Sequence, residues 1–465
     1  MSRRVVITGV GAVSALGVGA KALWDGLCAG TCGIAAPTLF DASGFPTKLA
    51  GEVKAPDAPP ASFSAKDYVP KSYRKAVKVM ARDTDLAVAA AKLAIEDAGL
   101  ITRGSLDGAA GQTTYPGERV GCQIGAGLIN AETDELSAAL ATATNESGQF
   151  EYWRWGTIAT EKHPAGVGGM NNLQPLWMLK YLPNMLACHV TIIHGCEGPS
   201  NTITCAEASV LLSVGEGMRV IQRDAADVCF SGGAESKTNL MGTLRWTLLK
   251  HLTPCEANAD PASLVKPYDP ASKGTILGEG GGMFVIEEAS KAAARGAKPY
   301  CELAGFGASH SPPPGYEAIR TRSRLSSDEK PHDGIVYAIE AALGDAKVNP
   351  NEIDAIVPYA SGIAHVDANE AAALRQVFGS RLKDIPLITV VPNTGAAVAG
   401  VGGLQLAAGA MAVREQRLPA RIHAGSCPSD MQAGPVSARA ASLRCVLVVT
   451  SALGGQNAAL VLKKV

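Results

Sequence analysis

The amino-acid sequence predicts an α/β fold made of two similar halves. Short runs of apolar, often β-branched residues alternate with longer amphipathic segments, and this alternation occurs twice along the chain. The apolar runs are continuous, which is typical of strands in a sheet that is covered on both faces. With 465 residues, of which 47% are hydrophobic and 18% charged, the chain can form a large core and is not a disordered protein.

The first half follows the order strand, helix, strand, strand, helix, strand. Its opening run, Val5 to Thr8, is β-branched and is followed by closely spaced glycines, which predicts a buried strand and then a glycine turn. Asp83 and Thr84 precede a stripe of Leu and Ala residues at helical spacing and predict a helix cap. The remaining elements are predicted as strands at 120–124, 203–205 and 227–230 and a helix at 207–221, with a glycine-rich insert at 103–118.

The second half repeats this order. Apolar residues at helical spacing predict a helix from Ile335 to Ala346, and a helix of small residues passes through Leu404 and Met411. Strands are predicted at 355–358, 388–390 and 445–449, and the polar, proline-rich segment 311–332 is predicted to be a surface loop. We therefore expect an internal duplication, with one half at 1–252 and the other at 253–465.

Charge and hydropathy exclude several classes of protein. Lys and Arg total 42 against 43 Asp and Glu, a net charge of -1, which argues against nucleic acid as a partner. Arg3 and Arg4 precede an apolar run that imitates a secretory signal, but its glycines and β-branched residues predict a strand instead. The apolar stretch at 176–193 is interrupted by Lys180 and Pro183, so no membrane span is predicted.

The cysteines and the glycine-rich segments indicate neither a metal nor a nucleotide cofactor. Eleven cysteines form no Cys-x-x-Cys pair, and we expect free, mostly buried thiols in a reducing cytoplasm. Gly9-Val-Gly11-Ala-Val-Ser14 resembles a dinucleotide fingerprint, but its third glycine is missing and no acidic residue follows at the required distance. The run from Gly278 to Gly282 lacks the Gly-Lys-Ser/Thr of a phosphate-binding loop. We therefore predict no cofactor and no metal.

The most informative segment runs from Gly198 to Ser209. A predicted strand ends there, and a helix begins at about Glu207. The first turn of a helix exposes unpaired N–H groups and the positive end of the helix dipole, so a side chain there can act as a nucleophile beside an oxyanion site. Glu207 can also be a plain helix cap, and the spacing alone favours this interpretation over a nucleophile.

Several motifs in this sequence resemble the β-ketoacyl-ACP synthase family of the thiolase fold. They are Arg3-Arg4-Val-Val-Ile-Thr-Gly9 with Gly11, Gly198-Pro199-Ser200, Ala226-Asp227-Val228 with Gly232-Gly233-Ala234-Glu235, Gly278-Glu279-Gly280 with Gly282-Met283, Thr394-Gly395, and Gly454-Gly455-Gln456-Asn457. The resemblance spans nearly the whole chain at agreeing spacings. It implies a layered α-β-α-β-α fold and decarboxylative Claisen condensation with malonyl-ACP, carried out by an acylated Cys, two His and a supporting Lys.

The positions of the family's catalytic groups carry other residues here. Glu207 stands nine residues after Gly198, where the family has its Cys. The other replacements are Tyr359 and Ala396 for the two His, Val391 for the Lys, and Ser451 and Leu453 for two Phe of the acyl pocket. Asp367 and Glu370 match an acidic pair that supports the family's Lys, so Glu370 needs another partner in this chain.

These replacements argue against the family's usual reaction. An acyl anhydride on Glu207 would hydrolyse readily, and without His no imidazole polarises the malonyl thioester. Tyr359 is a poor base at neutral pH because the pKa of a free Tyr is about 10. The resemblance is strongest to the chain-length-factor branch, whose members lack the Cys, commonly carry Gln in its place and pair with an active ketosynthase. We hypothesise that Glu207 occupies the oxyanion position with its own charge and silences the site.

Three further residues have alternative interpretations. Cys205, two residues before Glu207, is either a displaced nucleophile or a buried Cys of the strand. His365 is either a shifted general base or a surface or capping His. His194 is expected to pack or to form a hydrogen bond near a dimer face.

The sequence supports one leading hypothesis and two alternatives. The leading one is a non-catalytic subunit of the chain-length-factor type that forms a heterodimer with a Cys-bearing ketosynthase in fatty-acid or polyketide synthesis. The first alternative is a diverged acyl-thioester enzyme, condensing or decarboxylating, that uses Glu207 or Cys205. The second alternative is a homodimer that binds acyl carrier protein or acyl-CoA without chemistry. We expect acyl carrier protein as a partner and a cytoplasmic location.

Overall fold

Two arrays of strands pair in the same order in the computed structural model, which describes residues 3–54, 63–155, 157–161, 163–167, 173, 176–311, 333–423 and 425–465. The first array consists of β1 (Val5–Ser14), β3 (Val120–Gly125), β6 (Ser200–Ile203), β7 (Val228–Ser236) and β8 (Glu279–Glu288). The second consists of β9 (Cys301–His310), β10 (Ala355–Val357), β13 (Cys445–Ser451) and β14 (Gln456–Lys463).

The order of the first array is β6-β3-β7-β8-β1, and that of the second is β10-β13-β14-β9. In both arrays the pairs at one end are parallel and the later pairs are antiparallel. β1 also pairs with β9 from Val5 to Ile7, and β2 (Gly17–Val18) pairs with β1. Among the described residues the two arrays therefore join into one ten-stranded sheet. The repeated order confirms the internal duplication that the sequence predicts.

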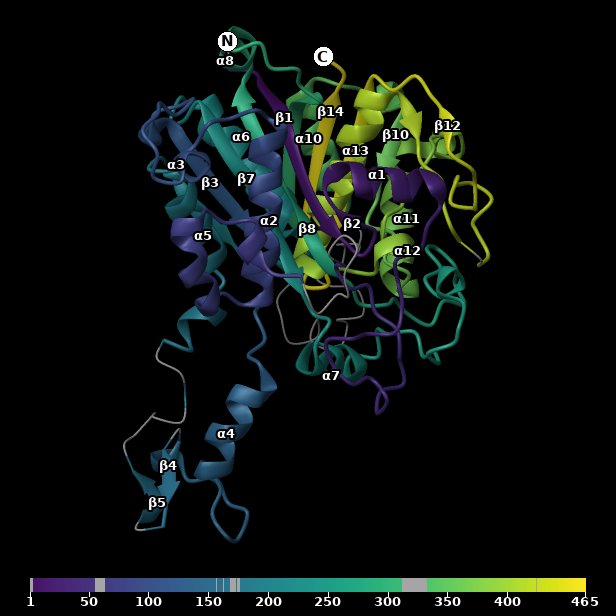
Figure 1. Ribbon diagram of the computed structural model, residues 1–465. Coiled ribbons are helices and arrows are strands. Elements are labelled where there is room, and N and C mark those ends of the chain that lie inside the picture. The colour runs from purple at the N-terminus through teal and green to yellow at the C-terminus, as the bar shows by residue number, and fades with distance from the viewer. Residues whose placement is uncertain are drawn as a thin grey trace, which may run out of the picture.

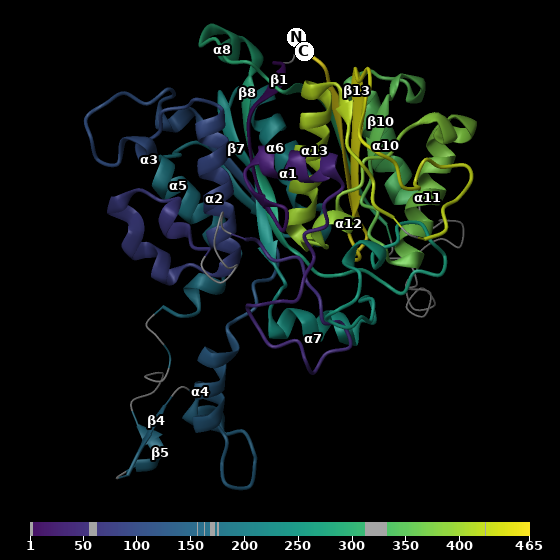
Figure 2. The same cartoon turned by 45° about the vertical axis from the view of Figure 1, so that its right-hand side comes forward.

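Helices cover both arrays and separate them, which gives the layered α-β-α-β-α arrangement (Figures 1 and 2). The outer helices on the first array are α2 (Arg82–Asp97) and α5 (Met185–His194). The middle layer contains α6 (Ser209–Gln222) and α13 (Val401–Glu415), and the outer helices on the second array are α10 (Asp333–Ala346) and α11 (Ala364–Phe378). Three large apolar clusters fill the spaces between these layers.

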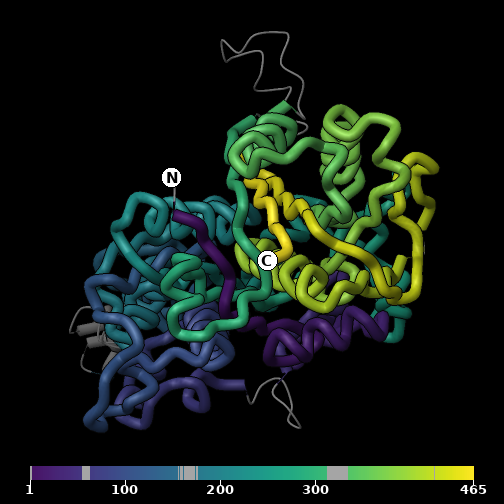
Figure 3. Tube along the Cα trace, turned by 90° about the horizontal axis from the view of Figure 1, so that it is seen from above, coloured from purple at the N-terminus to yellow at the C-terminus, as the bar shows by residue number. Residues whose placement is uncertain are grey.

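The remaining elements connect the layers or extend from them. They are α1 (Ala20–Ala29), α3 (Arg103–Leu106), α4 (Thr133–Ala143), α7 (Leu240–Leu248), α8 (Ala289–Ala294), α12 (Val391–Thr394), β4 (Ile158–Thr160), β5 (His163–Val167), β11 (Arg417–Leu418) and β12 (Arg439–Ala440). α4, β4 and β5 project from the body as an arm (Figures 1 and 2). From above, the N-terminal half lies beside the C-terminal half, and α1 reaches across toward the C-terminal half (Figure 3).

Gly9 and Gly11 lie inside β1, and the turn comes only after Ser14, at residues 15–16 before Gly17, so the predicted start of the turn was wrong. β1 continues to Ser14, with a shift in its pairing between Ile7 and Gly9. A Cβ atom at Gly11 would lie 2.0 Å from the carbonyl oxygen of Ala90. These glycines therefore let α2 pack directly against the backbone of the strand.

Other boundaries also differ from the prediction. Asp83 lies in the first turn of α2, whose N-cap is Ala81. The segment 388–390 is not a strand, and only an isolated parallel bridge joins Leu387 to Ile356 in its place. All but the first residue of the predicted loop at 311–332 lie outside the described residues. The predicted helices 335–346 and 207–221 and the strands 120–124 and 445–449 are confirmed within a few residues.

All eleven cysteines are free thiols, five of them buried and six partly exposed, which is fewer buried thiols than expected. Within the part of the chain that the structure describes, no helix has the length and apolar character needed to cross a membrane. The division of the halves between residues 252 and 253 stays a prediction. β8 follows that point in the sequence and pairs with β7 and β1 of the first array.

Candidate functional site

Glu207 lies in a short 3-10 helix, η7 (Ala206–Ala208), between the edge strand β6 and helix α6. It is 1% exposed, and its Oε2 accepts a hydrogen bond from the Leu453 N–H at 3.2 Å. Burial raises the pKa of Glu207 to about 7, while its own N–H and that of Leu453 oppose the rise. The carboxyl group is thus close to half protonated at neutral pH, whereas the sequence led us to expect a fully ionised group.

The backbone that leads into η7 is strained. Ala206 has a φ of 46°, in the left-handed region that residues with a Cβ adopt at a cost of about 1 kcal/mol. The Cys205 N–H donates a hydrogen bond to Ser209 Oγ at 2.8 Å, which ties the turn to the start of α6. Strained turns of this kind are concentrated at functional sites, because the surrounding structure must hold them in place. The turn directs the Glu207 carboxyl group toward the segment that joins β13 to β14.

Tyr359 is buried two residues beyond the end of β10. Its hydroxyl group has no hydrogen-bond partner among the residues that the structure describes. Burial raises the pKa of Tyr359 well above its usual value, and the negative charge of Glu207 raises it further. Tyr359 is therefore a neutral hydroxyl donor within electrostatic range of Glu207, and it cannot act as a base at neutral pH.

An apolar cluster fills the rest of the site. Tyr359, Val391 and Ala396 belong to this cluster, and Leu453 packs against it. The carbonyl oxygen of Ala396 accepts from the Gly278 N–H at 2.9 Å, and its methyl side chain supplies no hydrogen-bond donor. Four of the predicted site residues are thus brought together, and Glu207 joins them through the Leu453 N–H. Ser451, the last residue of β13, is also buried.

The acidic pair Asp367 and Glu370 lies on α11 and has partners that replace the missing Lys. The Tyr268 hydroxyl donates to Glu370 Oε2 at 2.8 Å, and the N–H groups of Tyr359 and Ala360 donate to the same carboxylate at 2.8 and 3.0 Å. Burial raises the pKa of Glu370 to about 7 against these donors. Tyr268 was missed at the level of sequence, and no local signal identifies it, because 102 residues separate it from Glu370.

A second charged cluster lies near Glu207. Glu235, on β7, forms an ion pair with Lys237, and its Oε2 accepts from the Ala399 N–H at 2.7 Å. The charge of Glu235 raises the pKa of Glu207, and that of Lys237 lowers it. Asp83 is buried in the same cluster, and burial raises its pKa to about 7. The sequence holds one usable signal for Lys237: it stands two residues after Glu235, so both side chains point to the same face of a strand.

Cys205 and His365 stand apart from the arrangement that the sequence suggested for them. Cys205 lies after the end of β6 and is partly exposed, so the interpretation as a buried strand Cys was wrong. Burial raises its pKa, so the thiol is protonated at rest. His365 lies in the first turn of α11, and its ring centroid is 5.5 Å from that of His251. A chemical role for either residue stays a prediction.

Polar side chains that interact electrostatically with Glu207 include those of Tyr359, Glu235 and Lys237. No cluster of three or more His, Cys, Asp or Glu within the described ranges has the geometry to hold a metal ion.

The layered fold and the turn after the edge strand define the class of thiolase-like ketosynthases. The solved structure named the ishigamide ketosynthase/chain length factor matches with a TM-score of 0.76 and 27% identity, covering 100% of both chains. A structure from Burkholderia phymatum, described as a beta-ketoacyl synthase, matches with a TM-score of 0.76 and 23% identity over 100% of both chains, which shows the fold alone.

The chain belongs to the beta-ketoacyl synthase family. The model of the family's N-terminal domain matches residues 2–292, and that of its C-terminal domain matches residues 318–425. The chain is 29% identical to the granaticin polyketide putative beta-ketoacyl synthase 1 of Streptomyces violaceoruber, over 100% of this chain and 99% of that protein. It is 27% identical to the 3-oxoacyl-[acyl-carrier-protein] synthase 2 of Staphylococcus aureus (strain COL), again over 100% and 99%. The resemblance found in the sequence is confirmed at the level of the family.

Proposed function

We propose that this chain is a non-catalytic subunit of the chain-length-factor type that pairs with a Cys-bearing β-ketoacyl synthase in polyketide or fatty-acid synthesis. The observation that carries the proposal is the buried Glu207 in the position of the family's nucleophile. Its carboxyl group accepts the Leu453 N–H and its own N–H, so the donors that would stabilise a tetrahedral intermediate are already used. Tyr359 and Ala396 supply no imidazole in place of the family's two His.

The exposed edge strand of the sheet supports the proposal that a second chain binds there. β6 ends the strand order, and among the described residues it pairs on its β3 side only. Ser200 and Asn201 of this strand are exposed. An exposed edge strand is a template for pairing with another chain. One structural relative is named as a ketosynthase/chain length factor, which supports a heterodimer for this chain as well.

A strip of positive charge supports acyl carrier protein as a further partner. All residues of the strip are exposed. Lys66 lies on the short helix before η3 (Lys71–Val79), and η3 itself carries Lys71, Arg74, Lys75 and Lys78. Such a strip attracts and orients an anionic partner. A structural relative is described as a type II polyketide acyl-carrier protein in complex with its ketosynthase. We infer that the carrier protein docks on this strip.

Reversal of charge in the strip is expected to weaken carrier binding. The double variant Arg74→Glu, Lys75→Glu should bind the holo carrier protein about 10-fold or more weakly at low salt, because two attractive charges become repulsive. The loss should shrink at high salt, where exposed charges are screened. Calorimetric titration measures both affinities. The control is Lys347→Glu, Lys464→Glu, which changes the net charge equally on two exposed lysines outside the strip. An equal loss in the control would contradict docking on the strip.

The proposed subunit role is tested by the mass of the intact protein. The chain is incubated with acyl-ACP and malonyl-ACP, first alone and then with a Cys-bearing β-ketoacyl synthase as partner. We expect no acyl adduct on this chain in either case, unchanged carrier substrates when it is alone, and co-purification with the ketosynthase. A stoichiometric acyl adduct mapped to Cys205 or Glu207, or turnover of the carrier substrates without a partner, would contradict the proposal.

A second candidate function is favoured by one observation. The pKa of Glu207 lies at about 7, where a general base is most effective. In this alternative the chain is an acyl-thioester enzyme in which Glu207 removes a proton while Tyr359 donates to the carbonyl oxygen. Turnover of a carrier-bound or CoA-bound acyl thioester by the chain alone, lost in Glu207→Gln, separates this alternative from the non-catalytic subunit.

A further inference from the structure

A cleft of about 540 Å³ lies where the C-terminal end of α13 meets α1 and α2. Arg414, in the last turn of α13, and Trp24, on α1, are among the residues that line it. Val401, at the other end of α13, belongs to the apolar cluster of the Glu207 site. Because α13 has 15 residues, its two ends lie about 20 Å apart. The cleft is therefore separate from the site described above.

The buried part of the lining is apolar. Trp24, Tyr300 and Met411 are 6%, 7% and 8% exposed, and they lie beside Val10 and Leu93 in the wall of the cleft. Small-molecule sites are typically clefts of about 300–1,000 Å³ with a mostly apolar lining and a few polar groups that fix the ligand. The size and the buried lining thus suit a small molecule with an apolar body.

The exposed part of the lining carries charges of both signs in equal number. The basic side chains are Lys21, Arg414 and Arg417, and the acidic ones are Asp25, Asp97 and Glu415. Lys21 and Asp25 pair with each other, one turn apart on α1. In the part of the chain that the structure describes, no ion pair engages the other four side chains. Unpaired charges of both signs in one cleft favour a ligand that itself carries both charges.

Tyr300 brings one charge of each sign close together. The guanidinium carbon of Arg414 lies 4.2 Å from the centre of the Tyr300 ring, and the Tyr300 hydroxyl donates to Asp97 Oδ2 at 2.8 Å. The Val10 N–H donates to the same oxygen at 2.9 Å, so the carboxylate is fixed, while Asp97 Oδ1 has no partner among the described residues. A carboxylate and an ammonium group on one carbon atom can therefore pair with Arg414 and Asp97 together.

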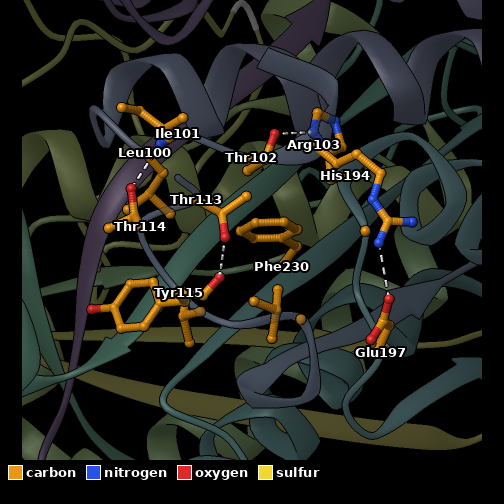
Figure 4. A pocket seen from close by; sticks show the side chains of 14 residues that line it. Leu100, Ile101, Thr102, Arg103, Thr113, Thr114, Tyr115, His194, Glu197 and Phe230 are labelled. Carbon is orange, nitrogen blue, oxygen red and sulfur yellow. Dashed lines mark hydrogen bonds and ion pairs between the residues drawn. The ribbon is translucent and has the colours of Figure 1, made fainter. Parts of the chain in front are cut away.

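The smaller cavity beside Phe230 lacks such free charges (Figure 4). Its volume is about 130 Å³, and its two charged lining residues, Arg103 and Glu197, pair with each other at 3.0 Å. Of these two cavities, only the cleft between α1 and α13 thus offers both an apolar wall and unpaired charges to a ligand.

We propose that the cleft between α1 and α13 binds an α-amino acid with a large apolar side chain. The carboxylate of the ligand pairs with Arg414, its ammonium group donates to Asp97 Oδ1, and its side chain lies against Trp24 and Met411. L-phenylalanine is a simple member of this class and serves as the probe.

The proposal is tested on the full wild-type chain by calorimetric titration with three ligands. L-phenylalanine is expected to bind saturably with a Kd on the order of 0.1 mM. Phenylpropanoate lacks the ammonium group and phenethylamine lacks the carboxylate. Each should bind about 10-fold more weakly, because it leaves one charge of the cleft without a partner. L-phenylalanine should also shift the indole N–H resonance of Trp24, which is assigned by its absence in Trp24→Phe.

Two variants assign the two charges. Arg414→Gln should lower the affinity for L-phenylalanine and phenylpropanoate about 10-fold and leave that for phenethylamine unchanged. Asp97→Asn keeps an oxygen for the Tyr300 hydroxyl and should show the reverse pattern, with phenethylamine weakened and phenylpropanoate unchanged. The control is Arg444→Gln, which removes a charge from an exposed Arg outside the cleft and should bind all three ligands like the wild type.

Four results would overturn the proposal. They are L-phenylalanine without saturable binding, equal affinities for the three ligands, an unmoved Trp24 resonance on binding, and a loss in Arg444→Gln equal to that in Arg414→Gln. The first three come from the wild-type chain, so they decide the matter even where a variant does not fold.

Discussion

Replacement of Glu207 by Gln is expected to raise the free energy of unfolding at about pH 8 by roughly 3 kcal/mol. The pKa of Glu207 is about 7 in the folded chain against an ordinary value of 4.5, because the side chain is fully buried. Ionisation of this group therefore costs more in the folded state than in the unfolded state. Gln keeps an oxygen that can accept the Leu453 N–H and carries no charge, so it removes that cost.

The sign of the pH dependence follows from the direction of this shift. Below the unfolded pKa of 4.5, both states hold the proton and the group has no effect on stability. As the pH rises from 4.5 to about 7, the unfolded state loses the proton first, and the folded state is progressively destabilised. The advantage of Glu207→Gln should therefore be largest above about pH 7 and fall below roughly 1 kcal/mol at about pH 5.

Urea unfolding at several pH values, followed by tryptophan fluorescence, measures this difference. Glu146→Gln is the control, because Glu146 is exposed and its replacement should change stability little at any pH. A gain for Glu207→Gln that is the same at all pH values, or no gain, would show that Glu207 does not carry the cost of a buried charge.

The same variant tests whether Glu207 silences the site. If the negative charge of Glu207, and not occupation of the Leu453 N–H alone, silences the site, the neutral amide of Glu207→Gln should permit measurable decarboxylation of malonyl-ACP, detected by mass spectrometry of the carrier. Glu207→Ala serves as the comparison, since it removes the carboxylate without supplying an amide. The cap interpretation of Glu207 was wrong, because Glu207 lies inside η7 and the N-cap of α6 is Ala208. An inert Glu207→Gln variant would contradict the silencing of the site by this carboxylate.

Replacement of Asp367 by Asn is expected to lower the free energy of unfolding by about 1–3 kcal/mol, because the cost of unpaired donors exceeds the relief of the buried charge that raises the pKa of Asp367 to about 6. Asp367 is buried, and four donors converge on its carboxylate: the N–H groups of Tyr268, Ser361 and Gly362, and the Ser361 hydroxyl, at 2.6 to 3.0 Å. An amide group would turn its own N–H toward two of these donors and leave them unpaired. The cost is high because no water reaches them.

The backbone around Asp367 adds to this expectation. Tyr268, Ala360 and Gly362 all have positive φ angles, of 63°, 49° and 81°. The Asp367 carboxylate accepts from the N–H groups of Tyr268 and Gly362, while that of Ala360 donates to Glu370. Loss of the Asp367 carboxylate should therefore also release the segment that positions Tyr359. The control is Asp430→Asn, which breaks an exposed ion pair with Arg375 and should cost less than about 1 kcal/mol. Similar losses in the two variants, measured by urea unfolding, would contradict this role of Asp367.

Much of the fold could be predicted because its signals are local. The β-branched run at Val5, the helical spacing from Ile335 to Ala346 and the repeated order of elements all depend on neighbours in the sequence. The length of β1 could not be predicted. Gly9 and Gly11 look like a turn in the sequence, and only the structure shows that α2 packs where their Cβ atoms would lie. The absence of a strand at 388–390 likewise depends on pairing between distant segments, since only Leu387 forms a bridge to β10, at Ile356.

The candidate site was also predictable only in part from the sequence. Motif spacing predicts Glu207, Tyr359, Ala396 and Val391 at the family's catalytic positions, and the structure brings these four residues together. The partner of Glu370 was not predictable, because Tyr268 reaches it from another segment. Nor did the sequence indicate that the Tyr359 hydroxyl would lack a partner in the described part of the chain.

By itself the sequence determined the family and the repeated alternation of strands and helices, and it predicts the replacement of the Cys and both His, because these depend on residue identity and spacing along the chain. Only the tertiary structure decided the charge of Glu207 and the existence of the cleft between α1 and α13. The donor that faces Glu207 comes from Leu453, 246 residues away, and the burial that shifts its pKa comes from all the layers around it. Protonation and cavities depend on solvent exclusion, which is a property of packed segments and not of any one segment.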